Sequence, residues 1–193
     1  MSNFKLELSL HGAEKLTLMR QLLEPTTFNR GMKGGIQYAA KAATPSIAKQ
    51  VGQFYSLKAA RIKAAILKPR FYSGGLAVSI PISRRSPTAF SYGAKYTPGK
   101  GVSVAFIKGD RKVYPKGFVL NIPTKDGDSS KLPFLRTGTE RKDIKVISGP
   151  SVGSGVLGTG RFAAQIKTAV TTRASEQFMA GIERELQRIS RGR

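Results

Sequence analysis

The sequence predicts an α+β fold with basic N-terminal helices, a small antiparallel β-sheet or sandwich, and a long C-terminal amphipathic helix. Apolar residues recur at spacings of three and four over residues 13–67 and again over residues 161–189, as on one face of a helix. Over residues 71–150 they alternate with polar residues, and Gly and Pro interrupt the runs. We divide the chain into residues 1–70, 71–150 and 151–193, and expect one structural domain with extensions.

The first segment is predicted to form a short strand followed by helices. The strand is indicated by apolar residues that alternate with polar ones: Phe4, Leu6, Leu8 and Leu10. Helices are expected over residues 13–23, 28–54 and 57–67. Pro45 lies inside the second pattern, so we expect either a kink there or a break with Thr44 as a new N-cap.

The middle segment is predicted to be a sheet of four or five short strands. The strand-like runs are residues 76–82, 102–106, 118–122 and 144–146. Residues 108–111 read Lys-Gly-Asp-Arg, which favours a hairpin turn. Residues 123–133 are polar and rich in turn-forming residues, so we expect a loop there.

The last segment is predicted to be a helix over residues 161–189 after a Gly/Ser-rich link at 149–160. Such a helix would be about 42 Å long, more than a small domain needs for its own core. We therefore expect it to cover a neighbouring copy of the chain, with the link acting as a hinge that lets it reach there. The candidate inter-subunit residues are Phe162, Ile166, Val170, Phe178, Ile182 and Leu186.

Positive charge dominates the composition. The net charge is +22, and no acidic residue occurs between Glu24 and Asp110, a stretch with 14 basic ones. Such self-repulsion requires counter-charge, and DNA phosphates and an acidic protein neighbour are about equally good sources; a merely solvated surface is a weaker third interpretation. Aromatic residues flank the basic helix without running through it, so any DNA contact is expected with the backbone and without sequence preference. The candidate residues are Lys58, Arg61, Lys63, Lys68, Arg70, Arg84 and Arg85.

Residues that could support catalysis are sparse. Cysteine is absent and His11 is the one histidine, with no nucleophile or carboxylate pattern beside it. Asp126 and Asp128 resemble the start of a calcium loop but lack the later acidic ligand, and residues 153–158 match G-x-G-x-x-G without a strand–turn–helix context. We expect no enzymatic activity, no metal and no cofactor. No membrane span or signal peptide is predicted, so the chain is expected to assemble in the cytoplasm.

Four segments in the second half resemble, in order and spacing, the minor tail protein Z family of phages and prophages. They are GVSV at 101–104, YPKGFVL at 114–120, LPFLRTG at 132–138 and IKVISGPSV at 144–152. Members of that family pair a basic helical N-terminal half with such a sheet and a final helix. Here that half reaches SLKAARIK at 56–63, and the resemblance covers roughly residues 25–190.

The resemblance implies a structural tail-completion protein at the head-proximal end of the tail, with no catalytic residues. It implies an oligomeric ring, expected to be a hexamer, that takes part in head–tail joining beside proteins such as the tail terminator or tail tube. Packaged DNA is a possible nonspecific contact, and the virion tail or neck is the expected location. The alternative that the composition leaves open is a free, sequence-nonspecific nucleic-acid-binding protein.

Overall fold

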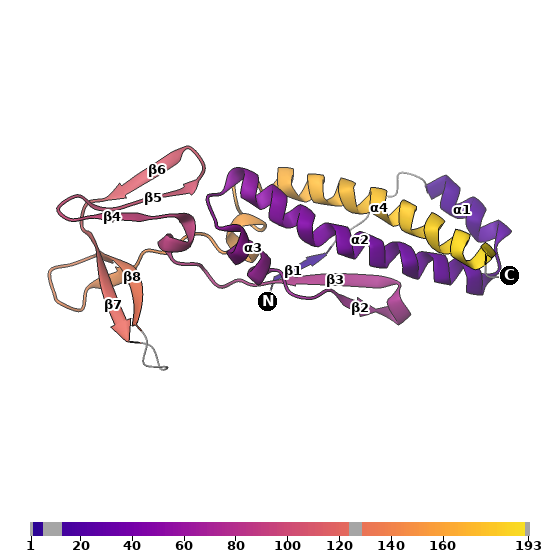
Figure 1. Ribbon diagram of the computed structural model, residues 1–193, viewed down its shortest axis with the longest axis horizontal. Helices are drawn as coiled ribbons and strands as arrows, with labels where there is room; N and C mark the ends of the chain where they lie inside the picture. The colour runs from indigo at the N-terminus through magenta and orange to yellow at the C-terminus, as the bar shows by residue number, and fades with distance from the viewer. Residues whose placement is uncertain (1, 6–12, 124–128, 192–193) are drawn as a thin grey trace.

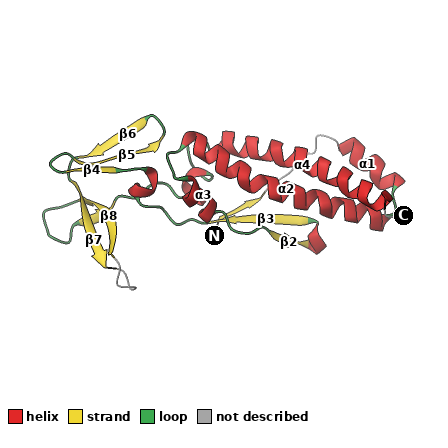
Figure 2. Ribbon diagram, viewed as in Figure 1, coloured by secondary structure: helices red, strands yellow, loops and turns green. Residues whose placement is uncertain are grey.

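The computed structural model describes residues 2–5, 13–123 and 129–191 and confirms the α+β class with a long C-terminal helix. Figure 2 shows the long helices at one end of an elongated molecule and two of its sheets at the other. The helices are α1 (Ala13–Leu22), α2 (Pro25–Phe54), α3 (Ala59–Ala65) and α4 (Ala163–Arg191). The strands are β1 (Ser2–Lys5), β2 (Arg70–Tyr72), β3 (Ala77–Ile82), β4 (Lys95–Thr97), β5 (Gly101–Ile107), β6 (Asp110–Tyr114), β7 (Gly117–Pro123), β8 (Ser129–Arg136) and β9 (Ile144–Val146). Three short helical turns are η1 (Ser73–Gly75), η2 (Ala89–Tyr92) and η3 (Val152–Val156).

Helices α2 and α4 lie side by side and form the main core (Figure 1). Both carry apolar residues at helical spacing, and each helix buries its stripe against the other. On α2 the buried residues include Ile36, Ala39, Ala43, Ile47 and Val51. Helix α2 continues through Pro45, whose ring is exposed to solvent, so the predicted alternative of a break with Thr44 as a new N-cap is wrong.

Glycine residues allow the two long helices to approach closely. A Cβ atom on Gly35 would lie 2.7 Å from Ile182 Cγ1 and 2.8 Å from the carbonyl oxygen of Phe178. A Cβ on Gly181 would lie 2.8 Å from Tyr38 Cβ and 3.0 Å from Gly35 Cα. Real Cβ atoms do not come this close to their neighbours, so the helices can cross here only because Gly35 and Gly181 have no side chain.

A three-stranded antiparallel sheet, in the order β1-β3-β2, packs against this helix pair. Its central strand β3 buries Ile80 and Ile82 in the core, and β2 pairs with β3 so that Phe71 faces Val78. The predicted first strand is present over residues 2–5, and Leu6, Leu8 and Leu10 lie outside the described residues. Residues 71–82, which we had assigned to the middle segment, thus belong with the helices.

The remaining strands form two further sheets, in the orders β4-β5-β6 and β7-β8-β9. The predicted hairpin turn joins β5 to β6, where Gly109 has a φ of 83° that favours glycine. The loop predicted over residues 123–133 is wrong from residue 129 onwards, because β8 pairs with β7 along its whole length and with β9. The described strands therefore form three small antiparallel sheets, of which the two distal ones contact each other through β4, β5 and β7.

Main-chain hydrogen bonds join the helices to the distal sheets. Ser56 N donates to the Phe106 oxygen at 3.1 Å, and Lys108 N donates to the Phe54 oxygen at 2.9 Å. The Phe54 ring stacks on Phe162, just before α4, with ring centroids 4.4 Å apart. The end of α2, the end of β5 and the start of α4 thus form one joint.

The Gly/Ser-rich link at 149–160 is folded into this joint. Ser151 is buried, and its hydroxyl accepts hydrogen bonds from the N–H groups of Ser154 and Gly155, both at 3.2 Å. Val152, Val156 and Leu157 are buried as well. The prediction that this segment is a hinge is wrong, because its side chains and amides are engaged in the core.

Candidate interaction surface

The described residues offer no cluster of metal-ligating side chains, since they hold no group of three or more His, Cys, Asp or Glu side chains able to bind a metal ion. On α4, Arg173 pairs with Glu176 and Arg188 with Glu185, each at 2.8 Å, so these acids serve neighbouring turns of the same helix. The predictions on His11, Asp126 and Asp128 fall outside the described residues.

Two tyrosines at the joint are held in their protonated form. Burial raises the pKa of Tyr92 well above its usual value, and its hydroxyl donates to the Pro150 carbonyl oxygen. Burial also raises the pKa of Tyr55. Tyr55 lines a cavity of about 270 Å³ with Asp110 and Arg161 among its other walls. Phenols that resist ionisation are poor general bases near neutral pH, so neither tyrosine is suited to that role.

The acid-free segment, defined here as residues 25–109, is the dominant electrostatic feature of the described chain. All 14 of its basic residues are exposed, and none is buried or drawn into the core. They are Arg30, Lys33, Lys41, Lys49, Lys58, Arg61, Lys63, Lys68, Arg70, Arg84, Arg85, Lys95, Lys100 and Lys108. The fold therefore places this charge where a partner can reach it.

Helix α3 carries three of the predicted site residues. Lys58 is its N-cap, and Arg61 and Lys63 lie on it, all exposed. Ala59, Ala60 and Ala64 are exposed, Ile62 is buried, and Ala65 is partly buried against the core. The exposed surface of this helix is therefore small or cationic.

Of the other four predicted site residues, Lys68 and Arg70 lie just before and at the start of β2, and Arg84 and Arg85 come after β3. Ser83 N donates to the Ala65 oxygen at 2.8 Å, so Arg84 and Arg85 continue from a point beside the end of α3. Leu67 N donates to the Pro81 oxygen at 2.9 Å, and Arg70 pairs with Ser79, so Lys68 and Arg70 lie along the same strand. The seven predicted basic residues are therefore brought to one connected region, formed by α3 and the strands after it.

The predicted inter-subunit residues lie elsewhere. Ile166 and Val170 are fully buried, and Phe178 and Ile182 are each 3% exposed, all against core residues of the same chain. Phe162 and Leu186 are partly buried and pack on the same core. The prediction that this stripe covers a neighbouring copy is wrong, because α2 offers an equally long apolar face within the chain.

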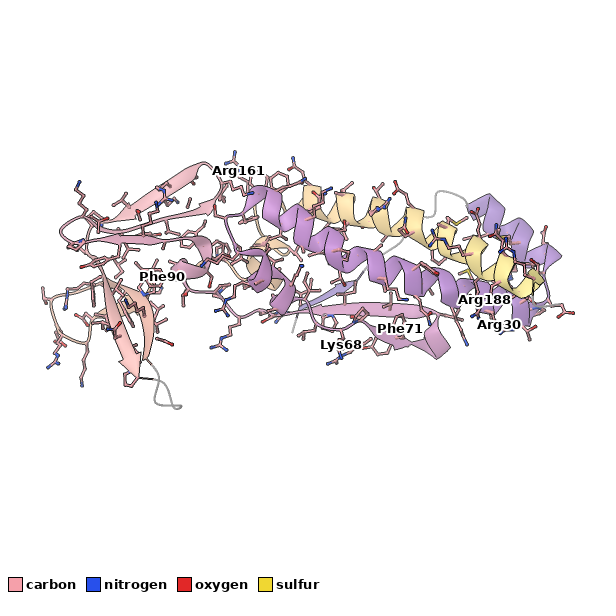
Figure 3. All side chains as sticks on the ribbon, in the orientation of Figure 1. Arg30, Lys68, Phe71, Phe90, Arg161 and Arg188 are labelled. Atoms are coloured by element: carbon pink, nitrogen blue, oxygen red, sulfur yellow. The ribbon has the colours of Figure 1, made fainter. Side chains whose placement is uncertain are left out.

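Sequence reasoning missed a cluster of exposed apolar side chains around β2. Leu67 is 37%, Phe71 45%, Tyr72 51% and Leu76 43% exposed. In Figure 3, Phe71 and Lys68 lie along the side of the helical body on which β2 runs. The available signal was the pair Phe71–Tyr72 between Lys68-Pro69-Arg70 and Ser73-Gly74-Gly75, a short apolar run bounded by charge and turn residues.

No family model, curated protein or solved structure matches this chain. In the part of the chain that the structure describes, no helix has the length and apolar character needed to cross a bilayer.

Proposed function

We propose that the protein is a non-enzymatic structural subunit of a tailed phage, a minor tail or tail-completion protein in an oligomeric ring at the head-proximal end of the tail. The observation that carries the proposal is the acid-free segment, whose 14 basic residues are all exposed. The resemblance of residues 101–104, 114–120, 132–138 and 144–152 to the minor tail protein Z family supplies the setting. The protein would reside in the tail or neck of the virion and take part in head–tail joining.

A ring gives this surface a physical role. Symmetry repeats the same basic region around one axis, so the potentials of several copies add over the lumen or the ring face. Packaged DNA or an acidic ring, such as a tail terminator or tail tube, would then supply the missing counter-charge. Helices α2 and α4 bury their apolar faces against each other. Contacts between copies, in a hexamer or another ring, would therefore involve sheet edges and loops.

Loss of the gene from the parent phage tests the proposal. We expect particles that lack the protein to show headless tails or tails with abnormal ends in negative-stain images, and the wild-type gene to restore them. Complementation with Lys58, Arg61 and Lys63 all changed to Gln should restore fewer joined particles. A matched triple change outside the acid-free segment, Arg141, Lys142 and Lys145 to Gln, removes three exposed charges and should complement fully. Normal particles without the gene would refute the proposal.

A free, sequence-nonspecific nucleic-acid-binding protein is the second candidate, because the same exposed charge would serve it. Each phosphate contact contributes about −0.9 to the slope of log K against log salt concentration on duplex DNA. The Lys58/Arg61/Lys63 change would therefore flatten the slope by roughly 2.7 if all three contact phosphate. Neighbouring genes separate the candidates, since tail-tube and terminator genes favour the first and translation genes the second.

A further inference from the structure

Among the described strands, β2 lies at the edge of the sheet that packs on the helices. The strand order β1-β3-β2 gives it one described partner, β3, and all three of its residues are exposed. Every second residue of an edge strand directs its N–H and C=O away from the sheet, where they can pair with another strand. We call residues 67–76, which comprise β2 and its flanks, the β2 edge.

The apolar side chains of the β2 edge are surplus to the core of the chain. The buried part of this sheet is supplied by Ile80 and Ile82 on β3, whereas Phe71 and Tyr72 remain about half exposed. Leu67 and Leu76 lie at the two ends of the same stretch and are similarly exposed. Scattered single apolar residues on a surface are ordinary, but here four exposed apolar side chains fall within ten residues along an edge strand, and Phe71 and Tyr72 place one aromatic ring on each face of it.

Charge restricts what this site can bind. Lys68 and Arg70 alternate with the apolar residues, and Lys33 of α2 lies against η1, where a Cβ on Gly75 would be 3.3 Å from its Cγ. No acidic residue occurs anywhere in residues 25–109. An antiparallel pairing with a second copy would oppose the two sets of Lys68 and Arg70, and like charges on paired strands are destabilising. The net charge of +22 on each copy adds to that repulsion.

Nucleic acid is also a poor fit for this particular edge. Phosphate contacts require cations and polar groups, which α3 and the residues after β3 already present. Contacts with the backbone of duplex DNA gain nothing from the two leucines and two aromatic side chains exposed here. A protein interface, by contrast, favours aromatic residues and arginine at its centre.

We infer that the β2 edge is a docking site for an extended, acidic protein segment that adds as a strand beside β2. Its main chain would pair with β2, its apolar side chains would cover Phe71 and Tyr72, and its carboxylates would meet Lys68 and Arg70. This inference rests on the proposed function only in placing the acidic partner in the same particle. The surface and the chemistry of the partner follow from the fold alone.

Binding of a synthetic peptide that alternates valine and glutamate, measured by fluorescence anisotropy with the full chain, tests the inference. We expect saturable binding that is lost for the valine–lysine analogue. Replacing alternate valines by proline removes amide donors and should weaken binding about tenfold, because strand addition depends on main-chain hydrogen bonds.

The chain offers a matched pair of variants for this assay. Tyr72 on β2 and Tyr96 on β4 are 51% and 44% exposed, and each lies on an edge strand of a three-stranded sheet. Tyr72→Ser should weaken peptide binding about tenfold, while Tyr96→Ser should change it less than about twofold. Likewise Lys68→Glu with Arg70→Glu should abolish binding, and Lys95→Glu with Lys100→Glu should preserve most of it. Circular dichroism checks that each variant is folded.

Three results would overturn the inference. Equal effects of Tyr72→Ser and Tyr96→Ser would show that the peptide binds by charge alone. Loss of duplex DNA binding on Tyr72→Ser, as large as the loss of peptide binding, would make the edge a nucleic-acid surface. Dissociation of an oligomer by Tyr72→Ser in light scattering would make the occupant a second copy. None of these results depends on particle morphology, so the docking site and the proposed function are tested by separate experiments.

Discussion

The close crossing of α2 and α4 allows a quantitative test in which one substitution is made at two places on the same helix. Gly35→Ala puts a methyl group 2.7 Å from Ile182 Cγ1 and 2.8 Å from the Phe178 oxygen. Alanine is favoured over glycine inside a helix by about 0.5–1 kcal/mol. Overpacking a close-packed site costs about 1–3 kcal/mol. Subtracting the gain from the cost gives a net loss of about 0–2.5 kcal/mol, or a Tm lower by up to about 10 °C for a chain of this size.

Gly52→Ala is the control. A Cβ on Gly52, also on α2, would meet a single side-chain atom, Ile62 Cδ1, at 4.0 Å. The higher helix propensity of alanine is then not offset by overpacking, so the Tm should stay constant or rise. Urea unfolding and calorimetry on the two variants give the comparison. If Gly35→Ala were as stable as Gly52→Ala, the two helices would not be in backbone contact at this crossing, and the argument for a glycine-dependent pair would fail.

Three further changes probe other parts of the fold. Phe178→Asp buries an unpaired charge and should destabilise the monomer itself by about 4 kcal/mol. Phe71→Asp, at an exposed position, should cost less than about 1 kcal/mol. A Phe178→Asp protein that is as stable as the wild type but has lost its oligomeric state in light scattering would contradict this. Burial raises the pKa of Tyr92, so the unfolded chain ionises near pH 10 while the folded chain does not; stability is therefore complete below that pH and declines above it. Tyr92→Phe should make the fall in the free energy of unfolding with pH less steep by up to about 1.4 kcal/mol per pH unit, measured by urea unfolding between about pH 9 and 11. Equal pH slopes for Tyr92→Phe and the wild type would contradict this prediction. Pro45→Ala should stabilise α2 by about 1–3 kcal/mol in thermal unfolding, because it restores a main-chain donor; a lower Tm would mean that the proline is needed by the surrounding packing.

Periodicity predicted the long helices well but could not tell which surface covers them. The stripe on α4, which includes Ile166 and Phe178, was recognised from its spacing, yet its length suggested a partner outside the chain. The partner is α2, whose own face is built from small residues such as Ala39 and Ala43. A stripe of alanine and glycine has little apolar area, so the sequence signal of its partnership is weak even though close packing makes it effective.

Local composition predicts the wrong structure where pairing between distant segments of the chain decides it. Strand β8 begins with Ser129 and Ser130 and contains Pro133, features that favour a loop, yet it is the central strand of its sheet. Pro133 has no N–H donor for the ladder, but its oxygen accepts a hydrogen bond from Ile147 N at 2.8 Å. The Gly/Ser-rich link was likewise read as a hinge, whereas Ser151 satisfies the amides of its own turn. The basic residues of the acid-free segment are exposed, since charge without counter-charge has no place in a core, and what they face stays a prediction.

The separation of α2 from α4 along the chain has a consequence for biosynthesis. The end of α2 at Phe54 and the end of α4 at Arg191 are 137 residues apart. At about 5–20 residues per second, a ribosome needs roughly 7 to 27 s to make that stretch. During this interval the apolar face of α2 has no α4 to cover it. A nascent chain in that state is a natural client for holding chaperones, and slow decoding between residues 55 and 162 would lengthen its exposure. Yield in cells should therefore respond to translation speed and chaperone supply more strongly than the stability of the finished fold would indicate.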